Sequence, residues 1–168
     1  EDVTSNIIKD NKFGTNKTLK GKKILIEHTS PNAFKALHVG HFMANTIGEA
    51  VARLLEFSGA GVKRATYGSD IGLPAAKAVW GMMQAKAEMP KDDSLLAHKI
   101  EFISNAYAHG SEMYEKDSEI KTQIDETNIR IYKNDDEDIN SIYQKGRGWS
   151  LEYLEEMYKK LDTKFDFH

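Results

Sequence analysis

A short apolar run, a long amphipathic pattern and a second short strand-like run constrain the fold of this chain more than any other feature. Ile24-Leu25-Ile26 is too short for a helix and rich in β-branched side chains, which is typical of a buried parallel strand. From His38 to Phe57 the apolar residues recur with the spacing of a helix that buries one face, at Met43, Ile47, Ala50, Val51, Leu54 and Leu55. A second short strand is predicted over Val62 to Tyr67. This succession predicts a βαβ unit with parallel strands and the default right-handed connection.

The loop that joins the first strand to the helix carries the side chains with the clearest chemistry. It reads Glu27-His28-Thr29-Ser30-Pro31-Asn32-Ala33-Phe34-Lys35-Ala36-Leu37, and His38-Val39-Gly40-His41 opens the helix. A helix N-terminus presents unpaired N–H groups and a partial positive charge, so it suits a phosphate. Two histidines three positions apart can face the same anion, and Gly40 leaves room for a nucleobase.

The histidine pair alone leaves three interpretations open: nucleotide binding, a hydrogen-bonded helix end, or two ligands of a metal ion. Two nitrogen ligands without a third candidate nearby make a weak metal site, and we therefore predict none. The acidic stretch Asn134-Asp135-Asp136-Glu137-Asp138 is more typical of a solvated helix start, because adjacent carboxylates point in different directions.

A second loop, Tyr67-Gly68-Ser69-Asp70-Ile71-Gly72-Leu73-Pro74, follows the second strand. Its glycines predict a tight turn, and Pro74 predicts the first residue of a helix that runs to about Lys86. Ligands of open parallel sheets bind beyond the carboxyl ends of the strands. We therefore expect loops 27–38 and 67–73 to converge on one crevice.

The rest of the chain predicts helices more than sites. Residues 1–20 are polar and lysine-rich, which favours a solvated lead-in over a contact with nucleic-acid phosphates. Residues 94–161 predict three helices, and Gly146-Arg147-Gly148 is a candidate kink or interruption in the last of them. Phe165 to His168 alternates like the beginning of a strand. The side chains most simply assigned to the core are Met82, Met83, Tyr107 and Trp149.

Composition sets further limits. The 168 residues carry a net charge of −3, so any contact with nucleic acid needs a local basic patch. The absence of cysteine excludes disulfides and cysteine-ligated zinc, and it fits a cytoplasmic protein. No apolar run approaches the roughly 20 residues that span a bilayer, so we expect no membrane contact. The sequence does not begin with methionine, which suggests a fragment of a longer protein.

These motifs resemble one known family. His38-Val39-Gly40-His41 is similar to the His-x-Gly-His signature of class I aminoacyl-tRNA synthetases and related nucleotidyltransferases. The preceding Ser30-Pro31-Asn32-Ala33-Phe34-Lys35 resembles the Ser-Pro-Asn-x-x-Lys run of arginyl-tRNA synthetases, as do Ile47 to Gly59 and Gly68 to Gly72. The similarity is clear over residues 10–81 and weaker beyond.

The resemblance implies an arginine–tRNA ligase, which uses ATP to make arginyl-adenylate and transfers the arginine to tRNA(Arg) in translation. Catalysis and ATP binding would fall to Lys35, His38 and His41, with Gly40 also at the nucleotide. Lys35 would partly replace a lysine of the family's second, Lys-Met-Ser-Lys-Ser-like loop, which this chain lacks. Mg²⁺ would arrive with ATP and not be held by a dedicated protein site.

Arginine would be held by Glu27, Ser30, Asn32 and Asp70. A carboxylate such as that of Glu27 is the natural bidentate partner of a guanidinium, although Glu27 can also be a surface residue at a strand end. Ser30 and Asn32 would contact the α-amino and carboxylate groups. Asp70 matches the family's Gly-Asp-x-Gly, but Ser69 intervenes here, and a turn-forming role is the alternative.

The implied fold is an α/β, Rossmann-like, parallel-sheet half-domain followed by a helical insertion. On this interpretation residues 1–20 are a linker from a missing N-terminal domain and 21–90 are the first half of the class I catalytic fold. Residues 91–163 are the connecting insertion, and 164–168 begin the next strand. Such a fragment would be inactive alone, and the full-length enzyme would be a monomer.

Two other functions stay open on the sequence. The first is a small stand-alone nucleotidyltransferase, which also uses His-x-Gly-His but carries a basic Ser/Thr-Arg loop late in its chain, where this one is acidic and helical. The second is a non-catalytic module that binds a partner or tRNA through its helices. Titration with labelled tRNA in the absence of ATP separates the second from the enzymes.

Overall fold

The computed structural model describes residues 3–10 and 12–168, which divide into two compact units. The first unit comprises the described residues up to Thr29 together with Val39–Tyr67 and Lys164–His168. The second comprises Ser30–His38 and Gly68–Thr163. The second unit thus contains the chain from Gly68 to Thr163 and a short segment that ends at His38, the first histidine of the pair.

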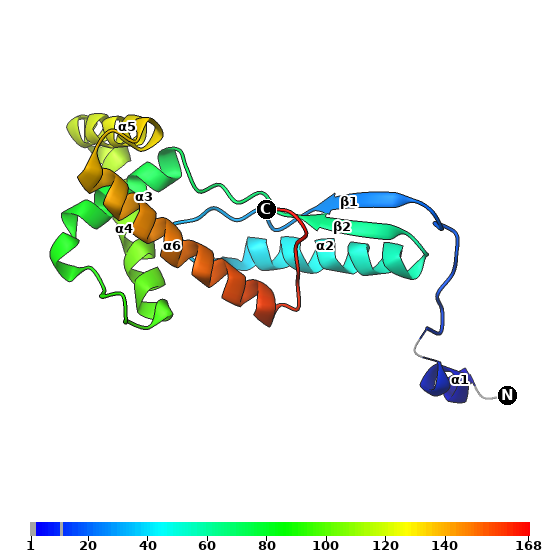
Figure 1. The fold of residues 1–168 in the computed structure, drawn as a ribbon. Helices are drawn as coiled ribbons and strands as arrows, with labels where there is room; N and C mark the ends of the chain where they lie inside the picture. Colours follow the sequence, from blue (N-terminus) through cyan, green and yellow to red (C-terminus); the bar gives the residue numbers. More distant parts are fainter. Residues whose placement is uncertain (1–2, 11) are drawn as a thin grey trace. The chain divides into compact units, whose positions relative to one another are not determined.

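The first unit contains the predicted βαβ arrangement (Figure 1). Strand β1 (Lys23–Glu27) pairs in parallel with β2 (Gly61–Ala65), with Lys23 opposite Gly61 and Glu27 opposite Ala65. Helix α2 (Val39–Phe57) connects the strands and lies along them. Near the end of the chain, Phe167 forms a parallel bridge to Ala65, and its carbonyl accepts a hydrogen bond from Thr66 N–H.

The buried faces of this unit differ from those that the sequence predicts. On α2 the side chains of Met43, Ile47 and Leu54 are 64%, 54% and 67% exposed, and the buried positions are Asn45, Gly48 and Ala52. The prediction that the apolar stripe of α2 is its buried face is therefore wrong for the described residues. The expectation of a fully buried β1 is also wrong, because only alternate residues of β1 turn away from solvent.

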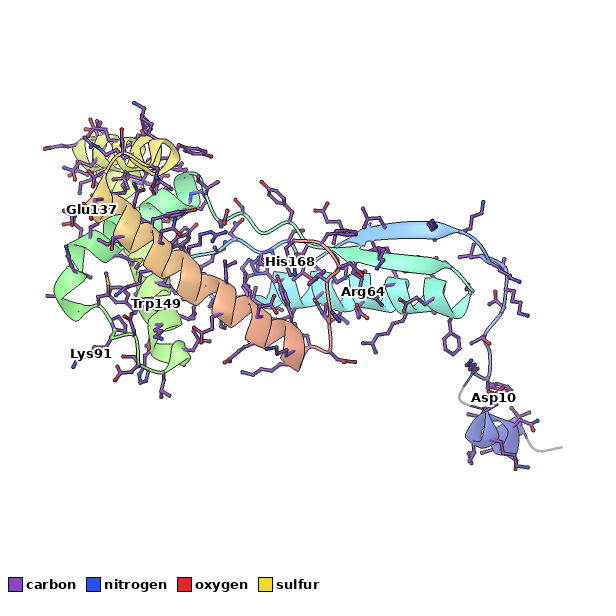
Figure 2. The ribbon with its side chains drawn as sticks, viewed as in Figure 1. Asp10, Arg64, Lys91, Glu137, Trp149 and His168 are labelled. Atoms are coloured by element: carbon purple, nitrogen blue, oxygen red, sulfur yellow. The ribbon has the colours of Figure 1, made fainter. Side chains whose placement is uncertain are left out.

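An ion-pair network explains why α2 turns a partly polar face to the sheet. Arg64 belongs to β2 (Figure 2). Its Nε lies 2.8 Å from Oε2 of Glu49 on α2, and its Nη1 lies 2.7 Å from Oε1 of Glu56 on the same helix. The hydrogen bonds that Arg64 donates to Glu56 and, with a smaller effect, to Glu49 raise the pKa of Arg64. Burial raises the pKa of Glu49, but hydrogen bonds from Arg64 and Arg53 outweigh it, and the pKa lies below its ordinary value.

The second unit is helical, as predicted for the later part of the chain. Its helices are α3 (Leu73–Gln84), a 3₁₀ turn η1 (Lys86–Glu88), α4 (Leu96–Lys116), α5 (Ser118–Lys133) and α6 (Glu137–Lys160). Pro74 lies in the first turn of α3, as expected. Met82 and Trp149 are buried in the core of this unit, and Met83 and Tyr107 pack against it, which confirms these four assignments.

Helices α3 and α4 approach closely because each places a glycine at their crossing. A Cβ atom built on Gly81 of α3 would overlap the backbone carbonyl oxygen of Ala106. A Cβ on Gly110 of α4 would overlap the carbonyl oxygen of Lys77 in the same way. Since the atoms in the way belong to the backbone, neither helix can accept a larger residue at these positions without moving.

The ends of the later helices follow ordinary capping rules. Asp136 caps α6, and its Oδ1 accepts a hydrogen bond of 3.0 Å from Ile139 N–H, which confirms the acidic stretch as a helix start. Helix α6 continues through residues 146–148, so an interruption at these glycines is wrong. A short helix α1 (Val3–Lys9) lies within the predicted lead-in and buries none of its residues. Among the described residues no helix is long and apolar enough to cross a bilayer.

Candidate functional site

The residues that the sequence nominates divide between the two units. Those in the first unit are Glu27, Gly40 and His41. Those in the second unit are Ser30, Asn32, Lys35, His38 and Asp70.

In the first unit, the candidates lie at the end of β1 and the beginning of α2. Glu27 is the last residue of β1 and is exposed. Helix α2 begins at Val39, one residue later than expected, so Gly40 and His41 lie in its first turn. That turn carries no acidic side chain. No carboxylate in the first turn of α2 therefore neutralises the positive end of the helix dipole. An anion site needs this positive partial charge.

His28, next to Glu27, joins β1 to α2 through a chain of hydrogen bonds. Thr29 Oγ1 donates to Asn45 Oδ1 at 2.9 Å and lies 2.9 Å from His28 Nδ1. Because the single hydroxyl proton of Thr29 is used on Asn45, His28 Nδ1 must be the donor to Thr29. The ring fills the space left by the absent side chain of Gly48. Sequence reasoning assigned this histidine no role.

Burial lowers the pKa of His28 below its ordinary value, with Glu49 acting in the opposite direction and Arg64 in the same direction. The unfolded chain therefore takes up a proton near pH 6.5, and the folded chain only at lower pH. We expect the free energy of unfolding to fall as the pH drops from about 6.5 to the folded pKa, by about 1.4 kcal/mol for each unit of pKa difference.

The matched variant for this pH effect is His28→Asn, whose Nδ2 can replace Nδ1 as the donor to Thr29 but does not titrate. Urea denaturation of both proteins between pH 7.5 and 5 measures the effect as the difference between the two pH profiles. Parallel profiles would show that His28 does not titrate differently in the folded and unfolded states.

In the second unit, the segment Ser30–His38 has an unusual backbone. Ser30 and Phe34 have φ angles of 40° and 64°, in the left-handed region that non-glycine residues rarely adopt. Phe34 is fully buried, and its ring stacks on that of Tyr143 with centroids 5.8 Å apart. Backbone outliers of this kind concentrate at functional sites, where the surrounding structure has to hold them in place.

Three backbone N–H groups of this segment donate to hydroxyl groups of the helices. Phe34 N–H donates to Ser150 Oγ at 2.9 Å. Ala36 N–H donates to Ser104 Oγ at 3.1 Å. Leu37 N–H donates to Tyr153 OH at 3.2 Å. Helices α4 and α6 thus hold the backbone on both sides of Lys35.

The second predicted loop lies beside the first. Asn32 and Ser69 form a parallel bridge, and Ala33 N–H donates to the carbonyl of Ser69 at 2.9 Å. The two loops are therefore neighbours in the parts of them that lie in this unit, and the shared crevice stays a prediction. Asp70 Oδ2 accepts a hydrogen bond of 2.6 Å from Arg147 Nε, which raises the pKa of Arg147. Asp70 therefore already binds a guanidinium of its own chain.

Lys35 projects toward α4, where its ammonium lies 5.6 Å from the centroid of the Tyr107 ring. A cation at this distance from an aromatic face is weakly attracted to it. Within residues 3–10 and 12–168, no group of three His, Cys, Asp or Glu side chains is placed to hold a metal ion.

The segment Ser30–His38 is called the signature loop below. Sequence reasoning missed the helix residues that contact it, namely Ser104, Gly146, Ser150 and Tyr153. The last three lie on one face of α6, and their spacing of four and three residues was visible in the sequence. Nothing in that spacing identifies the partner of the face. The partner is a segment more than a hundred residues earlier in the chain.

Comparison with known proteins gives a consistent result. The family profile described as tRNA synthetases class I (R), catalytic domain, matches residues 2–166. The arginine–tRNA ligase of Treponema denticola is 26% identical over 174 aligned positions, which cover 98% of this chain and 29% of the relative. The arginine–tRNA ligase of Wigglesworthia glossinidia brevipalpis is 30% identical over 166 positions, covering 99% of this chain and 28% of the relative.

A solved structure shares the fold. The arginyl-tRNA synthetase of Thermus thermophilus superposes with a TM-score of 0.62 and 21% sequence identity, covering 97% of this chain and 26% of that one. The chain therefore spans less than a third of the length of these relatives.

Proposed function

The chain belongs to the family of class I tRNA synthetase (R) catalytic domains, and from this premise we propose that it is part of an arginine–tRNA ligase. In the first step an α-carboxylate oxygen of arginine attacks the α-phosphorus of ATP. A new P–O bond forms, the bond to the β-phosphate oxygen breaks, and pyrophosphate leaves with the electron pair. In the second step a terminal ribose hydroxyl of tRNA(Arg) attacks the activated carbonyl, and AMP leaves.

Lys35, His38 and His41 are the proposed catalytic residues. The attack on phosphorus needs positioned positive charge and hydrogen-bond donors at the phosphoryl oxygens, because charge develops there in the transition state. Lys35 supplies a full charge, and the imidazoles supply N–H donors. The first turn of α2 adds backbone N–H groups at Gly40 and His41, with no acidic side chain to oppose an anion. Mg²⁺ belongs to this proposal as the ion that accompanies ATP.

The proposed arginine ligands are Glu27, Ser30, Asn32 and Asp70. The exposed carboxylate of Glu27, at the carboxyl end of β1, is supported as a guanidinium partner by its chemistry and by its place at a strand end. Ser30 and Asn32 follow in the signature loop and are proposed to bind the α-amino and carboxylate groups. Asp70 is engaged by Arg147, so its proposed contact with arginine requires Arg147 to share the carboxylate or to move.

The observation that carries the proposal is the family match over residues 2–166, which includes the whole Ser30 to His41 run. We propose further that the complete polypeptide acts as a cytoplasmic monomer in protein synthesis.

The test is amino-acid-dependent exchange of pyrophosphate into ATP by the complete polypeptide that contains this sequence, with Mg²⁺ present. We expect exchange with arginine in the presence of tRNA(Arg), and a rate with lysine or citrulline that is lower by at least about 10³-fold, because neither analogue offers a guanidinium. Exchange that is absent with arginine, or equal with lysine, would refute the proposed function. A panel of all twenty amino acids would then identify the true substrate.

A further inference from the structure

The segment Ser30–His38 does not hold its shape by itself. Phe34 lies in the left-handed region, which is unfavourable for a bulky side chain, and Ser30 lies there too. Without regular secondary structure, these residues lack the ladder of backbone hydrogen bonds that would fix them. The groups that hold the segment must therefore come from other parts of the chain.

One face of α6 supplies most of them. Tyr143, Gly146, Ser150 and Tyr153 recur at intervals of three, four and three residues, so they share one side of the helix. Tyr143 stacks on the ring of Phe34. A Cβ atom on Gly146 would lie 2.7 Å from Cε1 of the same ring, so only glycine permits this approach. Ser150 and Tyr153 receive the N–H groups described above.

Ser150 is the central member of this face. It is 2% exposed, and its hydroxyl donates to the carbonyl of Gly146 at 2.7 Å while accepting from Phe34 N–H at 2.9 Å. Because the site is buried, removal of the hydroxyl would leave the Phe34 N–H without a partner and without water. The easiest relief is rotation of Phe34 out of its left-handed conformation, and this rotation would redirect the next residue, Lys35.

We propose that α6, assisted by Ser104 of α4, is a clamp that sets the conformation of the signature loop, and that Ser150 is the positioning residue through which it places Lys35. The proposal rests on the proposed function for the role of Lys35 but not for the clamp itself. Ser150 contacts no substrate in this account. It acts through the backbone of Phe34, and the hydroxyls of Ser104 and Tyr153 hold the backbone beyond Lys35.

The first test measures the clamp without any enzyme activity. Amide hydrogen exchange is followed in the folded chain for wild type and Ser150→Ala. We expect amides of residues 34–37 to exchange at least about tenfold faster in the variant, with amides of α3 unchanged, because the opening is local. Ser111→Ala is the matched control, since Ser111 Oγ is buried in α4 without a hydrogen-bond partner in the described structure. Unchanged exchange at residues 34–37 in Ser150→Ala would overturn the proposal.

A second variant keeps the test decisive if Ser150→Ala does not fold. Tyr153→Phe removes one hydroxyl from a half-buried side chain and leaves the ring in place. We expect faster hydrogen exchange at Leu37 N–H, which donates a hydrogen bond to this hydroxyl in the wild type. Protection of Leu37 equal to that in wild type would contradict the clamp.

The second test separates a positioning role from a purely structural one, using arginine-dependent ATP–pyrophosphate exchange by the complete polypeptide. We expect Ser150→Ala to lower kcat by about tenfold with a smaller change in KM for arginine, and Ser111→Ala to leave both unchanged. In a Lys35→Ala background, Ser150→Ala should cause little further loss, because it acts through Lys35.

Equal losses in the two backgrounds would show that Ser150 acts independently of Lys35 and would overturn the positioning role. If the wild-type polypeptide shows no arginine-dependent exchange, the proposed function fails instead. The hydrogen-exchange experiment then still decides whether the clamp exists.

Discussion

Replacement of Lys35 by alanine should lower arginine-dependent ATP–pyrophosphate exchange by the complete polypeptide about 10²- to 10³-fold, mainly through kcat. The physical reason is that the α-phosphoryl group gains negative charge on its oxygens as pyrophosphate leaves, and a positioned ammonium stabilises that charge. His41→Ala should cause a loss of similar size, because His41 is in the first turn of α2, where its N–H and the helix dipole act together.

The control for charge alone is Lys91→Ala, which removes an exposed lysine from the segment between η1 and α4. It should leave exchange unchanged. Lys35→Arg should recover only part of the rate, because arginine keeps the charge but changes the shape and reach of the donor. If both Lys35→Ala and His41→Ala stay within twofold of wild type, neither residue contributes to the chemical step and the assigned site is wrong.

Replacement of Gly81 by alanine should destabilise the helical unit by about 3 kcal/mol, the upper end of the usual range for overpacking. The new methyl group would overlap the carbonyl oxygen of Ala106, a backbone atom of α4 that cannot rotate away. Helices α3 and α4 would have to separate, and their contacts with α5 and α6 would be lost in part. Urea denaturation followed by circular dichroism should show a lower midpoint with an unchanged slope.

Gly148→Ala provides the matched control within the same unit. A Cβ atom at Gly148 meets no atom within 4 Å, and the residue lies inside α6. Alanine is favoured over glycine in a helix interior, so this variant should be more stable than wild type by roughly 0.5–1 kcal/mol. If Gly81→Ala and Gly148→Ala shifted the urea midpoint in the same direction, that result would contradict the close approach of α3 and α4 at Gly81.

Local patterns in the sequence were enough to predict the strands and helices from β1 onward and to identify the loop that carries the candidate site residues. A β-branched run, a helical period and a second short strand pattern predict β1, α2 and β2, and Pro74 together with the acidic run at residues 134–138 indicates two helix starts. These predictions succeed because strand, helix and cap signals act over a few residues. The signature run from Ser30 to His41 likewise identifies the family from adjacent residues.

The same local patterns failed where burial depends on distant partners. The apolar stripe of α2 indicated its buried face, yet Met43 and Ile47 are exposed and Asn45 is buried. The reason is a set of partners just after β1 and on β2, since Thr29 hydrogen-bonds Asn45 and Arg64 pairs with Glu49. Gly146 was interpreted as a kink or interruption, because no local signal shows that an aromatic ring from another segment fills the space beside it.

By itself, the sequence determined the order of strands and helices from β1 to α6, the family, and the identity of the residues proposed to meet ATP and arginine. Only the tertiary structure decided how the loop that carries them is held. Phe34 keeps its left-handed conformation because Ser150, 116 positions later, accepts its N–H in a buried site. Backbone conformation at such a residue is set by the sum of contacts around it, and those contacts exist only once α4 and α6 have packed.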